Sequence, residues 1–293
     1  LLSTGGVFGS KTLNSSVGVH VDYFISSNPS GEDVRLFLHS SQASGTVSID
    51  NISIKEVLYD QPDGTLQLFN HPINKPRIEY DASGNCLGLL VEEARTNLFR
   101  YSQALSNVDL NLITTDNATV SPAGTQNASL CIPTSDNVEH YIDDQTVIAG
   151  TDYAISCFAK YGSGSYLLAF RGSGIGANPP QFNLQTGTVV TEGASGQWSN
   201  TKIEDVGNGW YKCSSVGNPN TTTPLRFQIL RSDGAPNFTG DGTGHYIWGI
   251  QIEQNSFPTS YIPTSGSAVT RAADVASLAV SEFGYNQDQG TVV

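Results

Sequence analysis

The sequence is poor in charge, and what charge it has is mostly negative. Charged residues make up 14% of the 293 residues, against roughly 25% in an average globular chain. Lys and Arg number 14 against 27 Asp and Glu, which gives a net charge of −13. Binding to a nucleic-acid backbone requires a dense stripe of basic side chains. The composition therefore excludes nucleic acid as a partner.

Long apolar runs and methionine are also missing. The sequence has no continuous apolar run of the length that a membrane-spanning helix needs, so it predicts no membrane span. It contains no Met and begins Leu1-Leu2-Ser3 without a signal-peptide pattern. We therefore expect the chain to be a fragment, a processed form or only the ordered part of a longer protein.

Motifs for catalysis are absent. The histidines are dispersed outside any HExxH spacing, and neither a GxSxG elbow nor a phosphate-binding loop occurs. The acidic pairs Asp143-Asp144 and Glu92-Glu93 are neighbours in sequence, and neighbours on a strand point to opposite faces. Such a pair cannot form a glycosidase dyad by itself. We predict that the chain is not an enzyme.

The four cysteines fit no zinc or redox spacing. One interpretation is that all of them are small buried apolar side chains. The other is that Cys157 and Cys213 form a disulfide across neighbouring strands. The cysteines are Cys86, Cys131, Cys157 and Cys213.

What the sequence does contain is a series of short alternating segments separated by Gly, Pro, Asn and Ser. Between residues 95 and 265 they recur every 8–20 residues or so, which is typical of an antiparallel jelly-roll β-sandwich. No amphipathic helix is evident, so we predict an all-β chain. The expected strands are 128–132, 139–142, 151–160, 165–171, 181–184, 188–190, 200–204, 210–216, 224–231 and 245–253.

Further β segments flank this module. Residues 1–57 predict a partial N-terminal β-sandwich, the last strands of one whose beginning is missing. Residues 58–94 predict a β connector, in which 76–80 and 86–92 form a β-hairpin around a turn at 81–85. Residues 266–293 predict a linker and the first strand of a further domain.

Several phrases resemble recurrent sequences in structural proteins of tailed bacteriophages. They are 88–98 (GLLVEEARTNL), 204–211 (EDVGNGWY), 248–253 (WGIQIE), 257–264 (FPTSYIPT) and 269–274 (VTRAAD). The resemblance implies a surface-exposed virion protein, of the tail-fibre, spike or head-decoration type. It also implies other virion proteins as partners, a location on the particle surface, and commonly a homotrimer.

The same resemblance implies a jelly roll similar to carbohydrate-binding modules, followed by a laminin-G-like domain that would begin near residue 290. Residues 46–57 separately resemble the last strand of a carbohydrate-binding module. Glycan adhesion by a virion protein is therefore one expectation. The alternative is a carbohydrate-binding module of a secreted polysaccharide-degrading enzyme.

A glycan site needs aromatic faces for the sugar ring and polar side chains for its hydroxyls. The expected strands at 166–171 and 226–231 combine aromatic or apolar residues with Arg. Trp198 has polar neighbours in the sequence, so it is the tryptophan that we expect to be exposed. Trp210 and Trp248 lie in apolar alternating strands and are expected in the core. The candidate glycan-binding residues are Trp198, Tyr166, Arg171, Arg226, Arg231 and Asp233.

Two further sites are expectations. A structural calcium ion is a candidate cofactor, because the resemblance places a calcium ligand at Asp50 in the partial N-terminal sandwich. The jelly roll at 95–265 has Gln251 and Glu253 at the corresponding position, which departs from the pattern. Pro258 and Pro263 prevent regular strand pairing, so 257–264 is predicted to form an extended strap. The strap covers either a neighbouring chain or the core of its own module.

Overall fold

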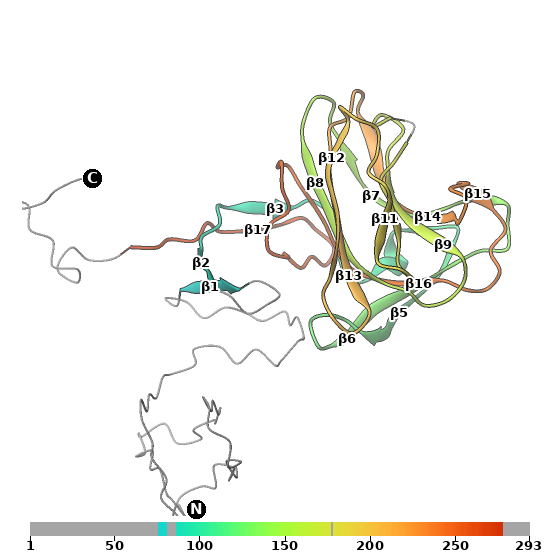
Figure 1. Cartoon of the computed structure of the whole chain (residues 1–293), viewed down its shortest axis with the longest axis horizontal. Helices are drawn as coiled ribbons and strands as arrows, with labels where there is room; N and C mark the ends of the chain where they lie inside the picture. The colour runs from blue at the N-terminus through green and yellow to red at the C-terminus, as the bar shows by residue number, and fades with distance from the viewer. Residues whose placement is uncertain (1–75, 81–85, 177, 278–293) are drawn as a thin grey trace, which may run out of the picture. The chain divides into compact units, whose positions relative to one another are not determined.

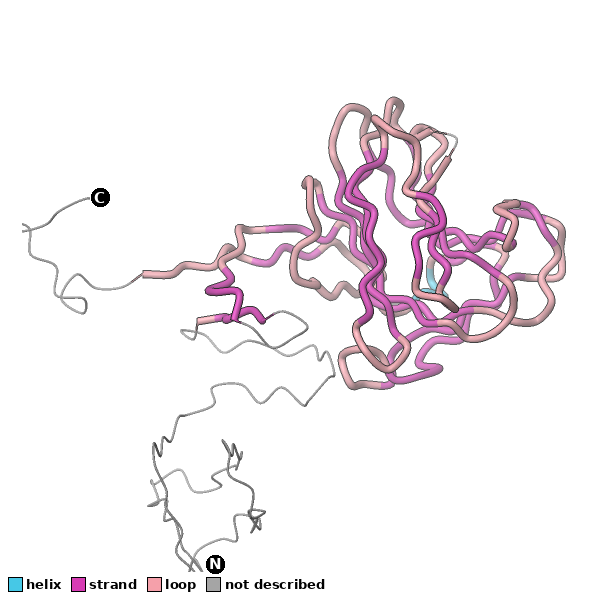
Figure 2. The backbone as a smooth tube through the Cα atoms, in the orientation of Figure 1, coloured by secondary structure: helices cyan, strands magenta, loops and turns pink. Residues whose placement is uncertain are grey.

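The computed structural model describes residues 76–80, 86–176 and 178–277 (Figure 1). The expectations for residues 1–57, for most of the connector before residue 76 and for 278–293 lie outside these residues. The described part is almost entirely strand and loop, and its one helical element is the short 3-10 turn η1 (Leu105–Asn107) (Figure 2). The all-β prediction is confirmed.

Two antiparallel sheets pack face to face as a jelly-roll sandwich, as predicted. The seven-stranded sheet has the order β11 (Thr188–Thr191), β10 (Gln181–Asn183), β9 (Tyr166–Arg171), β14 (Thr223–Arg231), β7 (Val138–Val147) and β15 (Asn237–Phe238), with β4 (Asp109–Leu110) also paired to β7. The six-stranded sheet has the order β12 (Trp198–Asp205), β13 (Trp210–Gly217), β8 (Tyr153–Lys160), β16 (His245–Glu253), β6 (Gln126–Pro133) and β5 (Leu112–Val120).

The main core lies between these sheets and follows from the two-residue period of each strand. On β14, Phe227 points inward and contacts Phe170 of β9 with ring centroids 5.1 Å apart. Alternate residues of the same strands, such as Arg226 and Arg171, therefore point outward. The alternation thus places Arg171 and Arg226 on the outer face of the seven-stranded sheet.

Strand β5 was not among the predicted strands. Its middle contains the polar residues Asp116 and Asn117, which interrupt the apolar alternation. In the structure Asn117 adopts a left-handed φ of 55°, and the register to β6 shifts between Thr115 and Thr119. Because β5 is the edge strand of its sheet, it tolerates this irregularity.

The predicted hairpin is present as β1 (Arg77–Tyr80) and β2 (Cys86–Leu90), which pair only with each other among the described strands. A network of charged side chains joins it to the pair β3 (Arg95–Asn97) and β17 (Val269–Arg271). Glu92 accepts hydrogen bonds from Arg77 (2.8 Å) and Arg271 (2.6 Å), and Arg77 also pairs with Asp274. Burial opposes ionisation of Glu92, but these cations and the Ser260 N–H lower its pKa below the usual range.

The strap covers its own module. Ile262 and Thr264 are buried against it. The buried Asn97 side chain donates to the carbonyls of Ile250 (3.0 Å) and Ile262 (2.9 Å), and its oxygen accepts from the N–H of Phe99 and of Ile252. One fully satisfied amide therefore ties the strap to the last strand of the sandwich.

Three of the four cysteines are buried, as the first interpretation expected, and the disulfide of the second is not formed. Cys157 and Cys213 lie directly opposite each other on β8 and β13, as the disulfide interpretation required, but both are free thiols whose pKa burial raises. Cys131 is buried as expected. Cys86 is exposed, because it opens β2 outside the sandwich, so the expectation of burial was wrong for it.

Candidate binding faces of the sandwich

The outer face of the seven-stranded sheet carries a connected polar network, here called the arginine face. Arg171 Nη1 donates to Oε1 of Glu139 (2.9 Å) and to Oε1 of Gln228 (3.0 Å), while Arg226 Nη1 donates to Oε2 of the same Glu139 (2.8 Å). The Nε of Arg226 lies 3.6 Å from Oδ2 of Asp143. The arginine face comprises Glu139, Tyr141, Asp143, Arg171, Arg226 and Gln228.

Each guanidinium group of the network has more than one partner. The guanidinium of Arg226 lies 4.0 Å from the ring centroid of Tyr141, so a cation–π contact adds to its ion pairs. Burial raises the pKa of the Asp143 carboxyl even though Arg226 acts in the opposite direction. Gln228 is 0% exposed, and its amide nitrogen has no hydrogen-bond partner. The face thus combines an unused buried donor with charged groups fixed in place.

Of the predicted glycan residues, Arg171 and Arg226 come together on this face, in register across β9 and β14. Arg231 and Asp233 do not join them. They form an exposed ion pair with each other where β14 ends, with Nε donating to Oδ1 over 3.0 Å. Arg231 is five residues beyond Arg226, and an odd spacing gives it the opposite parity on the strand.

The two predicted aromatic residues are not available on the surface. Trp198 is only 5% exposed, and its indole N–H donates to the carbonyl of Ile175 (2.6 Å). Its polar neighbours suggested exposure, but it belongs to the main core cluster. Tyr166 also points into the core, where it packs on Phe238 and donates to Asp241 (2.6 Å). Neither residue can serve as an exposed platform for a sugar ring.

The partners of the two arginines were missed in the sequence. Glu139, Tyr141 and Asp143 lie on β7 two residues apart, and Gln228 lies two residues from Arg226 on β14. Because residues two apart on a strand point to the same face of the sheet, the residues of β7 would have been expected on one face, and so would those of β14. The pairing of β7 with β14, which brings the two sets together, was not readable from the local pattern.

The outer face of the six-stranded sheet is different in kind and is here called the lysine face. It carries Lys160, Lys202 and Lys212, whose strand neighbours Ala159, Ile203 and Cys213 point into the core. An aromatic cluster of Trp210, Trp248, Phe158 and Tyr261 covers part of this face. Trp210 and Trp248 are therefore buried as predicted, but outside the core between the sheets.

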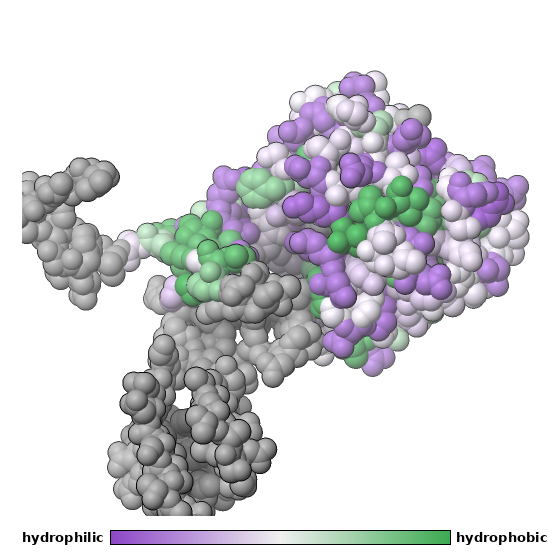
Figure 3. Space-filling view, in the orientation of Figure 1, coloured by the Kyte–Doolittle hydropathy of each residue, from purple (hydrophilic) through white to green (hydrophobic). Residues whose placement is uncertain are grey.

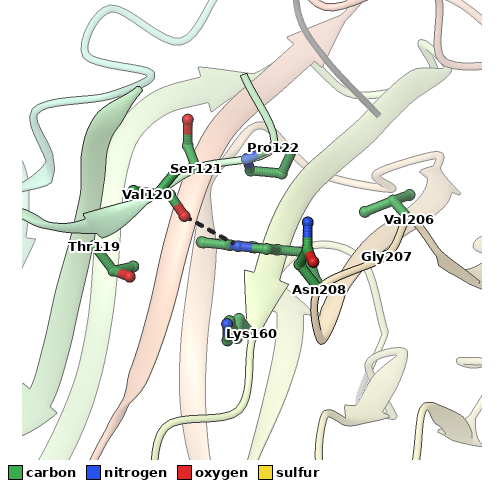
Figure 4. A pocket seen from close by; sticks show the side chains of 9 residues that line it. Thr119, Val120, Ser121, Pro122, Lys160, Val206, Gly207 and Asn208 are labelled. Carbon is green, nitrogen blue, oxygen red and sulfur yellow. Dashed lines mark hydrogen bonds between the residues drawn. The ribbon is translucent and has the colours of Figure 1, made fainter. Parts of the chain in front are cut away.

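A small hollow of about 190 Å³ opens beside this cluster. Lys160, Thr119 and Asn208 stand around it, and Ser121 and Pro122 form its other side (Figure 4). The indole N–H of Trp210 donates to the carbonyl of Val120 at its wall (3.2 Å). Among the described residues, no acidic side chain lines the hollow.

The two residues at the expected calcium position contact the strap. Thr259 donates to Glu253 through its N–H (2.9 Å) and its hydroxyl (2.5 Å), and Gln251 Nε2 donates to the same carboxylate (2.8 Å). Asp50 lies outside the described residues. Within those residues, no three His, Cys, Asp or Glu side chains come together in a way that could hold a metal ion.

No helix among residues 76–80, 86–176 and 178–277 is long and apolar enough to cross a membrane. No protein-family model and no curated protein sequence matches the chain. Among solved structures, the chain is similar to the CBM22-1–GH10 modules of an N-terminal endo-1,4-β-D-xylanase from Clostridium thermocellum, complexed with xylohexaose. The identity is 15% and the TM-score 0.31, over 58% of this chain and 30% of that one, so the likeness carries no functional argument.

Proposed function

We propose that the chain is a non-catalytic glycan-binding β-sandwich whose ligand lies on the arginine face. The observation that carries this proposal is the network of Arg171, Arg226 and Glu139, whose side chains are 28–32% exposed above the buried amide of Gln228. A sugar ring offers pairs of hydroxyls that both donate and accept hydrogen bonds. Guanidinium and amide N–H groups beside carboxylate oxygens match that pattern.

The balance of charge favours a neutral glycan. Glu139 and Asp143 lie close to the two arginines, so the four charges of the network cancel. An anionic ligand would have to displace a carboxylate that both guanidinium groups already bind. Neutral hydroxyls instead add to the network without breaking an ion pair. Because the side chains are already ordered, little conformational entropy remains to be lost on binding.

A glycan array followed by calorimetry tests this function. We expect micromolar to millimolar binding of a neutral oligosaccharide, abolished or weakened at least ~10-fold by Arg226→Ala because a charged hydrogen-bond donor is lost. Arg231→Ala is the matched control, since Arg231 lies off the arginine face. A blank array, or equal losses for the two variants, would contradict the proposal. Release of reducing ends from the bound glycan would show catalysis instead.

A second candidate function is structural, as an assembled virion component, and the exposed hairpin favours it. Ile78 and Leu89 lie directly opposite each other across β1–β2, and both are exposed, as are the neighbouring Val91 and Leu87, the latter to 65%. Figure 3 shows apolar residues gathered around this hairpin. An isolated two-stranded hairpin is only marginally stable, so a partner that covers its apolar face would stabilise it.

The oligomeric state tests this second candidate. We propose that copies of the chain associate through the hairpin, so light scattering should give a trimer mass that the double variant Leu87→Asp, Leu89→Asp converts to monomer. Val190→Asp, at an exposed apolar residue on β11, is the control. A monomeric parent chain, or a trimer that the double variant leaves intact, would rule out this mode of assembly.

A further inference from the structure

The cations of this protein are used in two different ways. Every arginine among the described residues forms an ion pair with a carboxylate. The three lysines of the same residues, Lys160, Lys202 and Lys212, form none. Lys212 stands directly across from Glu204 in the β12–β13 register without pairing to it. In a chain of net charge −13, three unpaired cations on one face are a local exception.

Lys160 differs from the other two because it lines the hollow. Its ammonium has no hydrogen-bond partner, and neither do the hydroxyl of Thr119 and the side-chain amide of Asn208 in the part of the chain described. Figure 4 shows these three groups around the opening together with Ser121, whose hydroxyl already accepts from the N–H of Ala123 (3.2 Å). Three unused donors therefore converge on a space without an acidic residue.

The turn between β12 and β13 builds this arrangement. Gly207, Asn208 and Gly209 all have positive φ values, of 86°, 54° and 74°. Glycine adopts such angles without strain, and asparagine tolerates them better than most residues. A Cβ placed on Gly209 would lie 3.5 Å from Cε of Lys160, so the lysine stem lies close over the turn. The turn thus holds Lys160 and Asn208 at the same opening.

We infer that this hollow binds the carboxylate-bearing ring of an acidic monosaccharide unit, such as a uronate. Lys160 supplies the single positive charge, and Thr119 and Asn208 supply neutral hydrogen bonds. Val120, Pro122 and Val206 supply an apolar wall for the carbon skeleton of a ring. A charge-assisted hydrogen bond to a carboxylate is roughly twice as strong as a neutral one, and no acidic residue at the site competes for Lys160.

The size and charge of the hollow fit one sugar unit rather than a glycan chain. This site lies on the sheet opposite the arginine face, so it does not rest on the proposed function. Binding at either site can fail while the other persists. The two sites also differ in ligand class, because the network of the arginine face has no net charge, whereas the hollow has one uncompensated cation.

The experiment is an NMR titration of the 15N-labelled chain with glucuronate, with glucose and sodium sulfate as comparison probes. The indole N–H of Trp210 reports directly, since it lies at the wall of the hollow. We expect glucuronate to shift this resonance with a millimolar or tighter dissociation constant. Lys160→Gln should weaken binding by ~10-fold or more, and added salt should weaken it further.

Lys212→Gln is the matched control, because Lys212 is unpaired on the same face but outside the hollow. It should leave the affinity for glucuronate unchanged. Equal binding of glucose, or an unchanged affinity in a folded Lys160→Gln variant, would overturn the inference. Sulfate binding as tight as that of glucuronate would show a general anion site and would overturn the assignment to an acidic sugar.

Discussion

The arginine face and the lysine face of the sandwich show two ways of placing cations on a β-sheet. On the arginine face, planar guanidinium groups share carboxylates and form a network without net charge. On the lysine face, compact ammonium groups remain without a carboxylate partner beside a large aromatic cluster. The first face owes its order to polar bonds, and the second owes it to apolar packing. Substitutions on the two faces should therefore affect stability by different amounts.

The largest effect is expected in the aromatic cluster of the lysine face. Trp248 packs on Tyr261 with ring centroids 4.7 Å apart and on Phe158 at 5.3 Å, and it is almost fully buried. Trp248→Ala should lower the free energy of unfolding by about 3–5 kcal/mol, because it leaves a large cavity. Denaturant unfolding followed by circular dichroism measures this change.

The control at the same position is Trp248→Phe. The indole nitrogen of Trp248 is buried without a hydrogen-bond partner, so its removal gives up no bond. We expect this variant to retain most of the stability that Trp248→Ala loses. Equal losses in the two variants would mean that the aromatic packing does not stabilise this face.

A smaller effect is expected for the polar network of the arginine face. Glu139→Gln removes the carboxylate that Arg171 and Arg226 share, and it should cost about 1 kcal/mol, since these side chains remain partly exposed to solvent. Lys212→Gln on the lysine face breaks no ion pair and should leave the unfolding midpoint within error. Equal changes in stability for Glu139→Gln and Lys212→Gln would mean that the ion pairs of the arginine face do not stabilise the fold.

The smallest effect is in the pH dependence of single carboxyls. Burial raises the pKa of Asp143 above 3.8, whereas hydrogen bonds from Thr243 and Tyr166 lower that of Asp241 below 3.8. Asp143 therefore contributes stability below pH 3.8 that is lost as the pH rises through its folded pKa. Asp241 contributes stability above pH 3.8 that is lost as the pH falls through its own folded pKa.

Carboxyl-detected NMR titration measures both pKa values in one sample. The difference between them should shrink in Tyr166→Phe, which removes the hydrogen bond that the Tyr166 hydroxyl donates to the Asp241 carboxylate and leaves Asp143 untouched. A pKa of Asp143 below that of Asp241 would show that charge pairing, and not burial, controls the arginine face.

The sequence predicted most strands of the sandwich because their apolar residues alternate over a buried face. It failed at β5, where Asp116 and Asn117 interrupt the pattern, since an edge strand is held by one neighbour and can contain a bulge. It also failed for Trp198, because polar neighbours in sequence say little about a side chain that turns inward. Trp210 and Trp248 were correctly expected to be buried, but the outer cluster depends on tertiary contacts with the strap.

The candidate sites were predictable only in part. Arg171 and Arg226 were identified, but the pairing of β7, β14 and β9 that supplies Glu139 and Gln228 connects distant segments. The hollow needs Thr119 from β5, Lys160 from β8 and Asn208 from the β12–β13 turn. Such a convergence is set by the order of strands in the sheet, and no local motif encodes it.

The most direct test of the proposed function is the response of the Gln228 side-chain amide to a neutral oligosaccharide selected on the glycan array. Gln228 lies at the centre of the arginine face, and its buried amide nitrogen has no partner. In a 15N NMR titration, the Gln228 amide and the Nε–H groups of Arg171 and Arg226 should shift together, while Arg231 stays unchanged. Shifts confined to other surfaces, with these three groups unmoved, would contradict glycan binding on the arginine face.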